Sequence, residues 1–344
     1  MGIQLKDILI CKEINLDALQ NKILVFDTYN LLYQFLTTIR GRDGSLLTDS
    51  KGQTTSHLVG LFSRTTKLME HNLRLAFVFD GKVPDLKKKE RERRQNLKKE
   101  AEAKYQEAVK KEDVDEMRKY AGRTTRLTPD LVEEAKKLIS ALGLPIIQAP
   151  SEGEAQAAYM VKKGDAFASI SQDFDSLLHG ASKLVRNLSL VGKRKKTNKL
   201  AYETIKPEII DLQENLTNLG LTHDQLIALA VLVGTDYNIG GVKGIGPKNA
   251  LKLVKKYPKD FDALFIEAKW DDFFDFSWKD VYDVIKNMPT TDKYTLEWKE
   301  PDFEAIRKLL VEKHDFSNER VENTLNELNK NKKERQQKGL GEFF

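Results

Sequence analysis

The chain has 344 residues, of which 40% are hydrophobic and 32% are charged. This length and balance predict a globular protein with a heavily charged surface and one large domain or two ordinary ones. No apolar run approaches the roughly twenty residues that span a bilayer, and the N-terminus lacks a signal-peptide pattern, so neither membrane insertion nor secretion is expected. Because Cys11 is the only cysteine, an intramolecular disulfide is excluded and a reducing compartment is expected.

The net charge of +5 is unevenly distributed along the chain. Residues 87–99 carry eight lysines or arginines against Glu90 and Glu92, a local excess of six positive charges. Clustered bases in a chain that also clusters carboxylates suggest a polyanion held near a metal. For each basic block alone, a solvated helix face or a basic loop is the alternative. The second block contains no acid and consists of Lys193, Arg194, Lys195, Lys196 and Lys199.

Two short apolar runs, Ile23–Asp27 and Leu75–Asp80, each end in an acid and look like buried parallel strands. Between them, residues 54–70 carry apolar side chains at helical spacing, and this strand, helix, strand order favours a parallel sheet. Residues 86–120 are highly charged, rich in helix formers and poor in large apolar residues. Such a helix buries little surface, so we expect it to stand off the body as an arch or lid.

The rest of the chain alternates predicted helices with short strands. Thr128-Pro129-Asp130 opens one helix, and Thr222 opens another as a capping box. From Asn326 onward, apolar residues thin out into a polar tail. These patterns predict an α/β fold: a mostly parallel central sheet flanked by helices, with a helical arch. The resemblance described below adds a helix-hairpin-helix type DNA-binding element to this expected fold. The expected elements are helices over Val132–Leu142, Glu152–Lys163 and Asn249–Lys256, strands over Leu144–Gln148 and Ala166–Ile170, and a hairpin over Lys183–Tyr202 with the second basic block in its turn.

Seven carboxylates follow these apolar segments: Asp27, Asp80, Glu152, Glu154, Asp173, Asp175 and Asp236. The carboxyl ends of the strands form the ligand-binding edge of an open α/β sheet, so the fold would gather these acids. Each carboxylate raises the pKa of its neighbours, so such a group stays ionised only when cations compensate it. Oxygen ligands without a His or Cys cluster select Mg²⁺ or Mn²⁺. Two such ions, about 4 Å apart, would activate a water and stabilise the leaving oxygen of an in-line displacement at phosphorus.

Each acid also has a structural explanation. Ser151 and Glu154 have the spacing of a capping box, in which Glu154 would reach back to the start of its helix. Asp27, Asp173, Asp175 and Asp236 have the character of turn residues. Their joint placement after successive strands is what favours a metal site.

The connector Ile239–Lys248 resembles a helix-hairpin-helix phosphate clamp. Gly244 and Gly246 let the backbone approach a phosphate, Pro247 suits the first helical position, and the next helix offers free N–H groups. Lys243 and Lys248 add positive charge. The alternative, a tight interhelical turn, does not explain the lysines.

With these motifs in this order, the chain resembles the flap endonucleases, structure-specific 5′ nucleases of DNA replication and repair, and most closely the archaeal members. The resemblance implies a Mg²⁺-dependent phosphodiesterase with 5′–3′ exonuclease activity that cuts 5′ flaps at the junction with duplex DNA, as in Okazaki-fragment maturation. It covers nearly the whole chain. The matching motifs are Met1-Gly2-Ile3-Gln4, Val25-Phe26-Asp27, Thr54-Thr55-Ser56-His57, Phe77–Lys82, Ala149–Ala155, Gly234–Tyr237 and Gly244–Lys248.

The resemblance also implies roles for individual residues. Lys87 and Arg94 would contact the scissile phosphate as catalytic cations, with Arg91 or Arg93 as alternatives to Arg94. Tyr33 would stack on a base near the cut, unless it is a core tyrosine. Two Mg²⁺ ions are implied, the first held mainly by Asp27, Asp80, Glu152 and Glu154, the second mainly by Asp173, Asp175 and Asp236.

DNA contacts are implied at three places. The stretch with Thr55 would hold the upstream duplex and its short 3′ flap, and residues 86 to about 125 would let the 5′ flap thread through the arch. The connector would clamp the downstream duplex where family members also bind K⁺ through main-chain oxygens. Such phosphate-based binding would be salt-sensitive and nearly sequence-blind. The clamp residues would be Lys243, Gly244, Gly246 and Lys248.

Gln337, Leu340, Phe343 and Phe344 match the pattern of a sliding-clamp (PCNA) ligand, and two phenylalanines on a polar terminus favour a partner pocket. We expect a single 5′ nuclease domain over residues 1–326 and a clamp-binding tail over residues 327–344. Within the domain we expect an N-terminal part, 1–105, that includes the start of the arch, and an internal part, 125–260. An ending without a basic extension is typical of archaeal members, so a monomer in the cytoplasm, associated with the nucleoid, is expected.

Two rival functions stay open at this point. One is another enzyme of the same superfamily, a 5′ exonuclease or a bubble-cutting repair nuclease. The compact arch and the tail argue against a bubble cutter, and product lengths would separate the rest. The other is a catalytically silent DNA-binding scaffold recruited by the clamp, against which the full set of seven acids argues.

Overall fold

A seven-stranded sheet lies at the centre of the molecule, with strand order β1-β9-β6-β5-β2-β3-β4. The structure is a computed structural model that describes residues 3–190, 192–195 and 202–341. Strands β2 to β6 run parallel; at one edge β9 pairs antiparallel with β6, and β1 pairs antiparallel with β9. The strands are β1 Lys12–Glu13, β2 Ile23–Asp27, β3 Arg74–Phe79, β4 Ile146–Gln148, β5 Ala168–Ile170, β6 Lys183–Arg186 and β9 Glu208–Asp211.

The two central strands explain why the sequence forms a parallel sheet. β2 and β3 are nearly continuous apolar runs, and such runs are stable where both faces of a strand are covered. Phe26 and Phe77 pair in register, and their rings stack 5.2 Å apart. The sheet and its flanking helices confirm the predicted α/β fold class.

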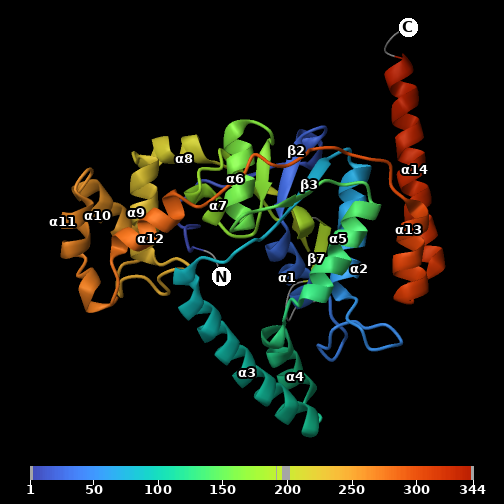
Figure 1. The fold of residues 1–344 in the computed structure, drawn as a ribbon, viewed down its shortest axis with the longest axis horizontal. Coiled ribbons are helices and arrows are strands. Elements are labelled where there is room, and N and C mark those ends of the chain that lie inside the picture. Colours follow the sequence, from blue (N-terminus) through green and yellow to red (C-terminus); the bar gives the residue numbers. More distant parts are fainter. Residues whose placement is uncertain (1–2, 191, 196–201, 342–344) are drawn as a thin grey trace.

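Helices cover both faces of the sheet (Figure 1). α1 (Thr28–Thr38), α2 (Ser56–Glu70) and α5 (Pro129–Ala141) share one apolar cluster with β2 and β3. α6 (Gly153–Lys163) packs in a separate cluster with Val25, Val78 and Ile147, whose side chains lie on the other face of the sheet. The sheet is therefore covered on both sides, which leaves its strand ends as the open edge.

A helical lobe extends from one end of the sheet and shares a third apolar cluster (Figure 1). Its core helix α9 is buried from Gln225 to Leu232. The predicted capping box is present, because Thr222 and Gln225 bond to each other's backbone N–H. The lobe consists of α7 Asp175–Leu178, α8 Leu212–Leu219, α9 His223–Val233, α10 Pro247–Lys256, α11 Phe261–Glu267, the 3₁₀ helix η5 Trp270–Asp272 and α12 Trp278–Lys286.

At the other end of the sheet, α13 (Phe303–Arg307), the π-helix η6 (Lys308–Lys313) and α14 (Asn318–Gly341) pack beside α2 and α5. The predicted polar tail is thus helical as far as it is described. Val321 and Leu325 are buried and attach the start of α14 to the body. Gln337 and Leu340 fall in α14, and Phe343 and Phe344 lie outside the described residues.

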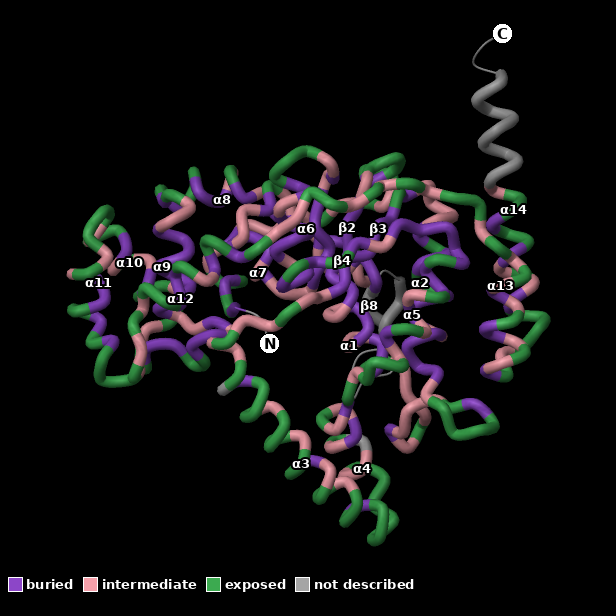
Figure 2. Tube along the Cα trace, in the orientation of Figure 1, coloured by how far each residue is buried: buried purple, intermediate pink, exposed green. Residues whose placement is uncertain are grey.

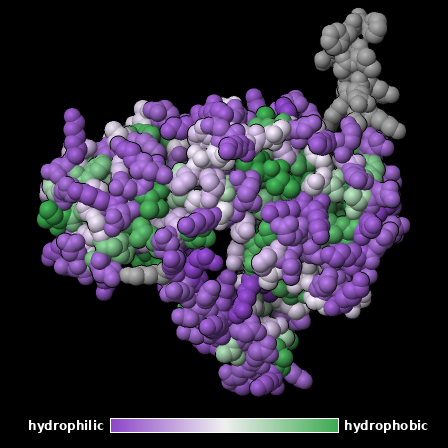
Figure 3. Space-filling view, in the orientation of Figure 1, coloured by the Kyte–Doolittle hydropathy of each residue, from purple (hydrophilic) through white to green (hydrophobic). Residues whose placement is uncertain are grey.

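The charged segment forms a helical hairpin that projects from the body, as predicted (Figures 1 and 2). It contains α3 (Lys88–Lys110) and α4 (Val114–Ala121), and mostly hydrophilic residues cover it on the face shown in Figure 3. The chain reverses at Glu112, whose φ is +53°, and Asp113 caps α4. The buried residues Ala101, Ala108 and Ala121 have small side chains, which allow the hairpin helices close approach. The 3₁₀ helices η2 Asp85–Lys87 and η3 Gly122–Thr124 join this arch to the body.

The hairpin predicted over Lys183–Tyr202 is wrong in its extent. Residues 183–186 form β6, which pairs with β5 and β9 in the main sheet, and its Leu184 and Val185 are fully buried there. The hairpin pairs β7 (Gly192–Lys195) with β8 (Tyr202–Ile205). Lys193, Arg194 and Lys195 lie in β7, and Lys196 and Lys199 lie outside the described residues. The remaining 3₁₀ helices are η1 Leu16–Leu19 and η4 Leu188–Leu190.

Within the described ranges, no single helix is both long and apolar enough to cross a membrane. The pair α8 and α9 passes that length and composition test together, but the two helices meet at an angle of 81°.

Candidate active site

The seven predicted carboxylates line one cavity of about 1060 Å³ beneath the arch. They reach it from four neighbouring strands and the end of α9: Asp27 ends β2, Asp80 follows β3, Glu152 and Glu154 follow β4, Asp173 and Asp175 follow β5, and Asp236 follows α9. Because parallel strands end at the same edge, acids far apart in the chain meet there.

Two loops are locked together at the carboxyl ends of β3 and β4. The Asp80 Oδ1 accepts a hydrogen bond from the Gly153 N–H at 2.7 Å, and the Gly81 N–H donates to the Ser151 carbonyl at 2.6 Å. A Cβ atom on Gly81 would lie 2.2 Å from the Ala149 carbonyl oxygen, so only glycine permits this approach. The loops therefore hold Asp80 against the start of α6.

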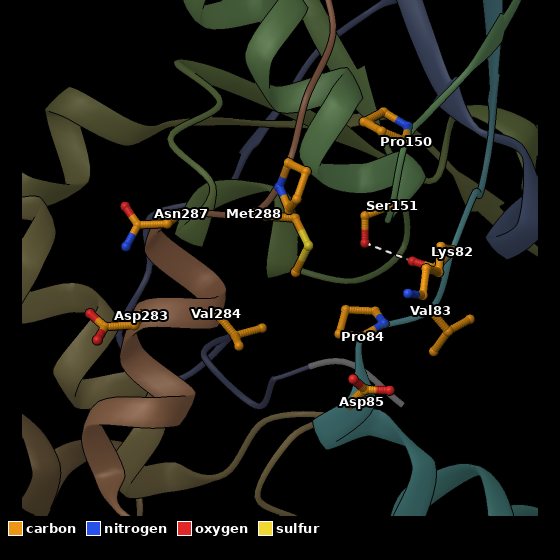
Figure 4. A pocket seen from close by; sticks show the side chains of 11 residues that line it. Lys82, Val83, Pro84, Asp85, Pro150, Ser151, Asp283, Val284, Asn287 and Met288 are labelled. Atoms are coloured by element: carbon orange, nitrogen blue, oxygen red, sulfur yellow. Dashed lines mark hydrogen bonds between the residues drawn. The ribbon is translucent and has the colours of Figure 1, made fainter.

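The capping-box explanation for Ser151 and Glu154 is wrong. Glu152 is the N-cap residue of α6, and its side chain makes no capping hydrogen bond; the first N–H of the helix, that of Gly153, donates to Asp80 instead. The Ser151 hydroxyl instead donates to the Lys82 carbonyl at 2.9 Å (Figure 4). This contact lies beside a smaller cavity of about 450 Å³. Figure 4 shows Val284 of α12 and Met288, which follows that helix, on the opposite side of it. Without a capping role, Glu154 is available to the cavity.

Asp27 has a structural role and also lines the cavity. It caps α1 by accepting from the Asn30 N–H, and the Asn30 side-chain amide donates to Asp173 at 2.7 Å. Asp175 accepts from the Ile3 N–H at 3.2 Å. Asp27 is therefore the last residue of a strand and a helix cap, not a turn residue, and Asn30 links it to Asp173.

Burial and mutual repulsion raise the pKa of several of these acids. Burial and then the Asp173 charge raise the pKa of Asp175 to about 7, and burial raises that of Asp80 to about 6. Burial, followed by the charge of a neighbouring acid, raises the pKa values of Asp27 and Glu154 well above their ordinary ranges. The cluster carries more negative charge than its own surroundings compensate.

Two cations, Lys87 at the base of the arch and Arg94 on α3, partly compensate this charge. Lys87 forms ion pairs with Glu152 and, at 3.2 Å, with Asp236, and Arg94 contacts Asp236 at 2.6 Å. Burial opposes the charge of Lys87, but Glu152, Glu154 and Asp236 outweigh it and raise the pKa of Lys87. Burial likewise opposes the charge of Asp236, yet Lys87 and Arg94 lower its pKa.

The arginine alternatives differ in their contacts. Arg91 and Arg93 also line the cavity, but Arg93 pairs with Glu90 on its own helix. Arg94 contacts both Glu90 and Asp236, so it bridges the arch and the acidic cluster.

The donor chemistry of the cavity fits a divalent cation. A bound cation stabilises the ionised form of a carboxylate, and this stabilisation is largest where burial and repulsion have raised the pKa of the acid. An all-oxygen set of this kind suits hard ions such as Mg²⁺ or Mn²⁺.

Three residues at this site escaped the sequence analysis. Tyr237 donates to Glu152 at 2.7 Å, Asn30 orients Asp173, and His179 lies within 4.8 Å of both Glu152 and Glu154. Burial lowers the pKa of His179 to about 4. Tyr237 directly follows Asp236 and Asn30 lies three residues after Asp27, so proximity to the acids was the available signal. Nothing local to His179 links it to residues 152–154.

The predicted DNA-contacting residues occupy three environments. Tyr33 is half-buried, lines the cavity and bonds to Lys98 at 3.1 Å, so it is not a core tyrosine. Thr55, by contrast, is 5% exposed and precedes α2. The connector residues Lys243, Gly244, Gly246 and Lys248 are exposed, and Pro247 opens α10 at its first turn as predicted.

Two family profiles match the chain: the XPG N-terminal domain over residues 1–101 and the XPG I-region over residues 143–236. Flap endonuclease 1 of Pyrococcus abyssi is 52% identical over 344 residues, which cover 100% of this chain and 98% of that protein. The chain belongs to the flap endonuclease family. Flap endonuclease 1 of Hyperthermus butylicus is 51% identical over 346 residues, covering 99% of this chain and 98% of that protein.

Solved structures agree with this assignment. Flap endonuclease-1 from Methanococcus jannaschii superposes with a TM-score of 0.74 at 42% identity, covering 95% of this chain and 98% of that one. The catalytic core of Rad2 in complex with DNA shares the fold, with a TM-score of 0.68 at 24% identity, over 95% of this chain and 100% of that one. Family membership confirms the predicted fold class and enzyme class: this flap endonuclease is a DNA nuclease.

Proposed function

We propose that this flap endonuclease hydrolyses the phosphodiester bond at the base of a 5′ flap, at the junction with duplex DNA, with two Mg²⁺ ions as cofactors. The observation that carries the proposal is the cavity beneath the arch, lined by seven carboxylates together with Lys87 and Arg94. A site that combines crowded carboxylates with fixed cations suits hydrolysis of a phosphate ester. The first ion would be held mainly by Asp27, Asp80, Glu152 and Glu154, and the second mainly by Asp173, Asp175 and Asp236.

The chain's own cations have a separate task. Lys87 and Arg94 extend from the arch side of the cavity to the carboxylates, so a phosphate bound there would meet two preorganised positive charges. Such charges stabilise the negative charge that develops on the phosphate oxygens in the transition state. When bound, divalent ions would supply water activation and stabilisation of the leaving oxygen.

The arch and Tyr33 would position the single strand. The arch is basic on its inner side, where Lys98 and Lys104 line the cavity, and the nearby Tyr33 presents a half-buried ring to a nucleotide base. Base stacking on an aromatic ring is insensitive to sequence and contributes about 1–3 kcal/mol per base. The 5′ flap would thread through the arch, and the Thr54–His57 segment at the start of α2 would hold the upstream duplex.

The connector before α10 would bind the downstream duplex backbone. A Cβ atom added at Gly246 would have no atom within 4 Å in the described part of the chain, apart from its sequence neighbours, so internal packing does not account for the glycine. Gly246, the N-cap residue of α10, offers no capping side chain, which leaves backbone N–H groups for a phosphate. Lys243 and Lys248 would add positive charge, and a K⁺ ion bound by main-chain oxygens would complete the clamp.

The remaining features fit a replication enzyme. The nuclease domain would span residues 1–326 and act as a monomer at the nucleoid, and residues 327–344 would bind the sliding clamp PCNA. Changing both Phe343 and Phe344 to alanine should abolish stimulation of cleavage by the clamp and leave basal cleavage unchanged. A loss of basal cleavage would contradict the assignment of this tail to clamp binding.

The test is incubation with an end-labelled duplex carrying a 5′ flap, with Mg²⁺ and with EDTA, and with products resolved to one nucleotide. One metal-dependent product at the junction is expected. A ladder of products would indicate a 5′ exonuclease, and binding without cleavage would indicate a DNA-binding scaffold.

A further inference from the structure

His179 lies behind the acidic cluster, on a loop that no motif identified. It follows α7, directly after the segment that carries Asp173 and Asp175, and it does not line the large cavity. One of its ring nitrogens lies within 4.8 Å of carboxylate oxygens of both Glu152 and Glu154, which themselves lie within that distance of each other. The three side chains thus form a compact donor group with one nitrogen and two carboxylates.

The end of α12 sets the tautomer of this imidazole. His179 Nδ1 lies 3.0 Å from the Ile285 carbonyl oxygen, in the last turn of α12. A carbonyl oxygen only accepts hydrogen bonds, so Nδ1 carries the proton and Nε2 keeps its lone pair. This arrangement is the usual one for a histidine that binds a metal, because the bonded nitrogen fixes the ring orientation.

The carboxylates of Glu152 and Glu154 differ in their hydrogen-bond and ion-pair partners. Glu152 is bonded to Lys87 and to Tyr237. Within the described ranges, no hydrogen bond or ion pair reaches the carboxylate of Glu154. An imidazole lone pair and a carboxylate are both acceptors, so a cation between them would satisfy both.

We propose that His179, through Nε2, is a nitrogen ligand of a divalent cation that Glu152 and Glu154 also hold, and that it biases this site toward Mn²⁺ over Mg²⁺. Donor atoms around one octahedral ion lie about 3–4 Å apart, so small side-chain rotations suffice to bring the three together. Imidazole nitrogen binds Mn²⁺ better than Mg²⁺, which prefers oxygen and water. The inference rests on the metal binding in the proposed function and adds a ligand that sets metal preference.

The test uses the full chain without DNA and Mn²⁺ alone as the probe. Pulsed electron paramagnetic resonance of bound Mn²⁺ detects a directly coordinated ¹⁴N nucleus, and we expect that signal in the wild-type protein. His179→Gln should abolish it and weaken Mn²⁺ binding by about tenfold, while competition by Mg²⁺ should show less than about a twofold change in Mg²⁺ affinity.

His223→Gln is the matched control. The His223 ring lies near Gly180, and its Nε2 is within 2.9 Å of the Leu177 carbonyl, but His223 does not belong to the donor group. This variant should keep both the ¹⁴N signal and the Mn²⁺ affinity.

The outcomes separate this inference from the proposed function. If wild-type protein binds Mn²⁺ without ¹⁴N coupling, His179 is not a ligand, and the carboxylate metal site of the proposed function still stands. The same conclusion follows if His179→Gln leaves the signal in place. If Mn²⁺ does not bind at all, both the inference and the metal assignment in the proposed function are wrong.

Discussion

Two groups of buried ionisable side chains in this protein behave in opposite ways. Near α13, His314 lies between two acids, with Nδ1 2.8 Å from Asp49 and Nε2 2.9 Å from Glu134. Lys313 also contacts Glu134, at 2.6 Å. Burial opposes the charge of Glu134, but its contacts with His57, Lys313 and His314 lower its pKa to about 2. We refer to this set as the histidine cluster.

The acidic cluster at the sheet edge lacks that internal compensation. Its acids Asp80 and Asp175 have pKa values raised to about 6 and about 7, and Lys87 and Arg94 reach it from the arch. A structural group balances its charges with its own neighbours, whereas a binding site leaves charge for its ligands. The comparison teaches that uncompensated negative charge, rather than burial, distinguishes a binding site from a structural group.

The largest expected effect comes from removing one acid of the acidic cluster. Asp173→Ala should reduce flap cleavage by at least about 1000-fold, equivalent to roughly 4 kcal/mol of transition-state stabilisation. Flap binding should persist, and the free energy of unfolding without metal should not fall, because a like charge is removed. Single-turnover cleavage, DNA binding and urea unfolding measure these three quantities. Full activity in this variant would contradict the metal assignment.

The next effect concerns the basic side chains that contact the acidic cluster. Arg94→Ala should slow single-turnover cleavage by about 100-fold, because one preorganised charge is lost. Arg93→Ala is the control: Arg93 pairs with Glu90 on the arch, so a change of less than about fivefold is expected. An equal loss in both variants would favour a general effect of arch charge over a specific role for Arg94.

In the histidine cluster, the same type of change should affect stability instead of catalysis. Glu134→Ala removes the carboxylate shared by His314 and Lys313, and should lower the free energy of unfolding by about 2–4 kcal/mol. Glu133→Ala, which breaks an exposed pair with Lys136, should cost less than about 1 kcal/mol. Urea unfolding measures both. A slower cleavage rate in fully folded Glu134→Ala protein would show that the histidine cluster affects catalysis as well as stability.

The smallest effect is a dependence on pH. The pKa of Glu134 in the folded protein, about 2, is below its ordinary value of 4.5, so its stabilising contribution is complete above pH 4.5. That contribution is lost as the pH falls from about 4.5 toward about 2. The difference in unfolding free energy between wild type and Glu134→Gln should therefore shrink over this window. A constant difference would show that the charge of Glu134 does not stabilise the fold.

Local patterns in the sequence were enough to predict much of the fold. The signals that worked all act through neighbours within a few residues. They are the apolar runs at Ile23 and Leu75, the capping residues Thr128 and Thr222, and the proline that opens α10. The placement of the seven acids was also predictable, because the ends of parallel strands share one edge.

Contacts between distant segments were not predictable in this way. His179 bonds to Ile285, and His314 bonds to Asp49, 265 residues away. The segment 258–311 has no regular pattern, yet it supplies α12, which orients His179. The hairpin error has the same origin, since only pairing with β5 and β9 shows that Leu184 and Val185 belong to the main sheet.

The close approach of the Gly81 backbone to the Ala149 carbonyl limits which residue types this fold accepts at position 81. Any other residue there would have to move the Ala149 carbonyl, and with it the loop that carries Glu152 and Glu154. The exposed neighbour Lys82 meets no such limit, because it joins that loop through its backbone. In a library randomised at both positions and selected for flap cleavage, position 81 should return almost only glycine, whereas position 82 should return many residue types. The close approach of the Gly81 backbone to the Ala149 carbonyl thus restricts the residue type at position 81, although residue 81 itself carries no chemical group of the site.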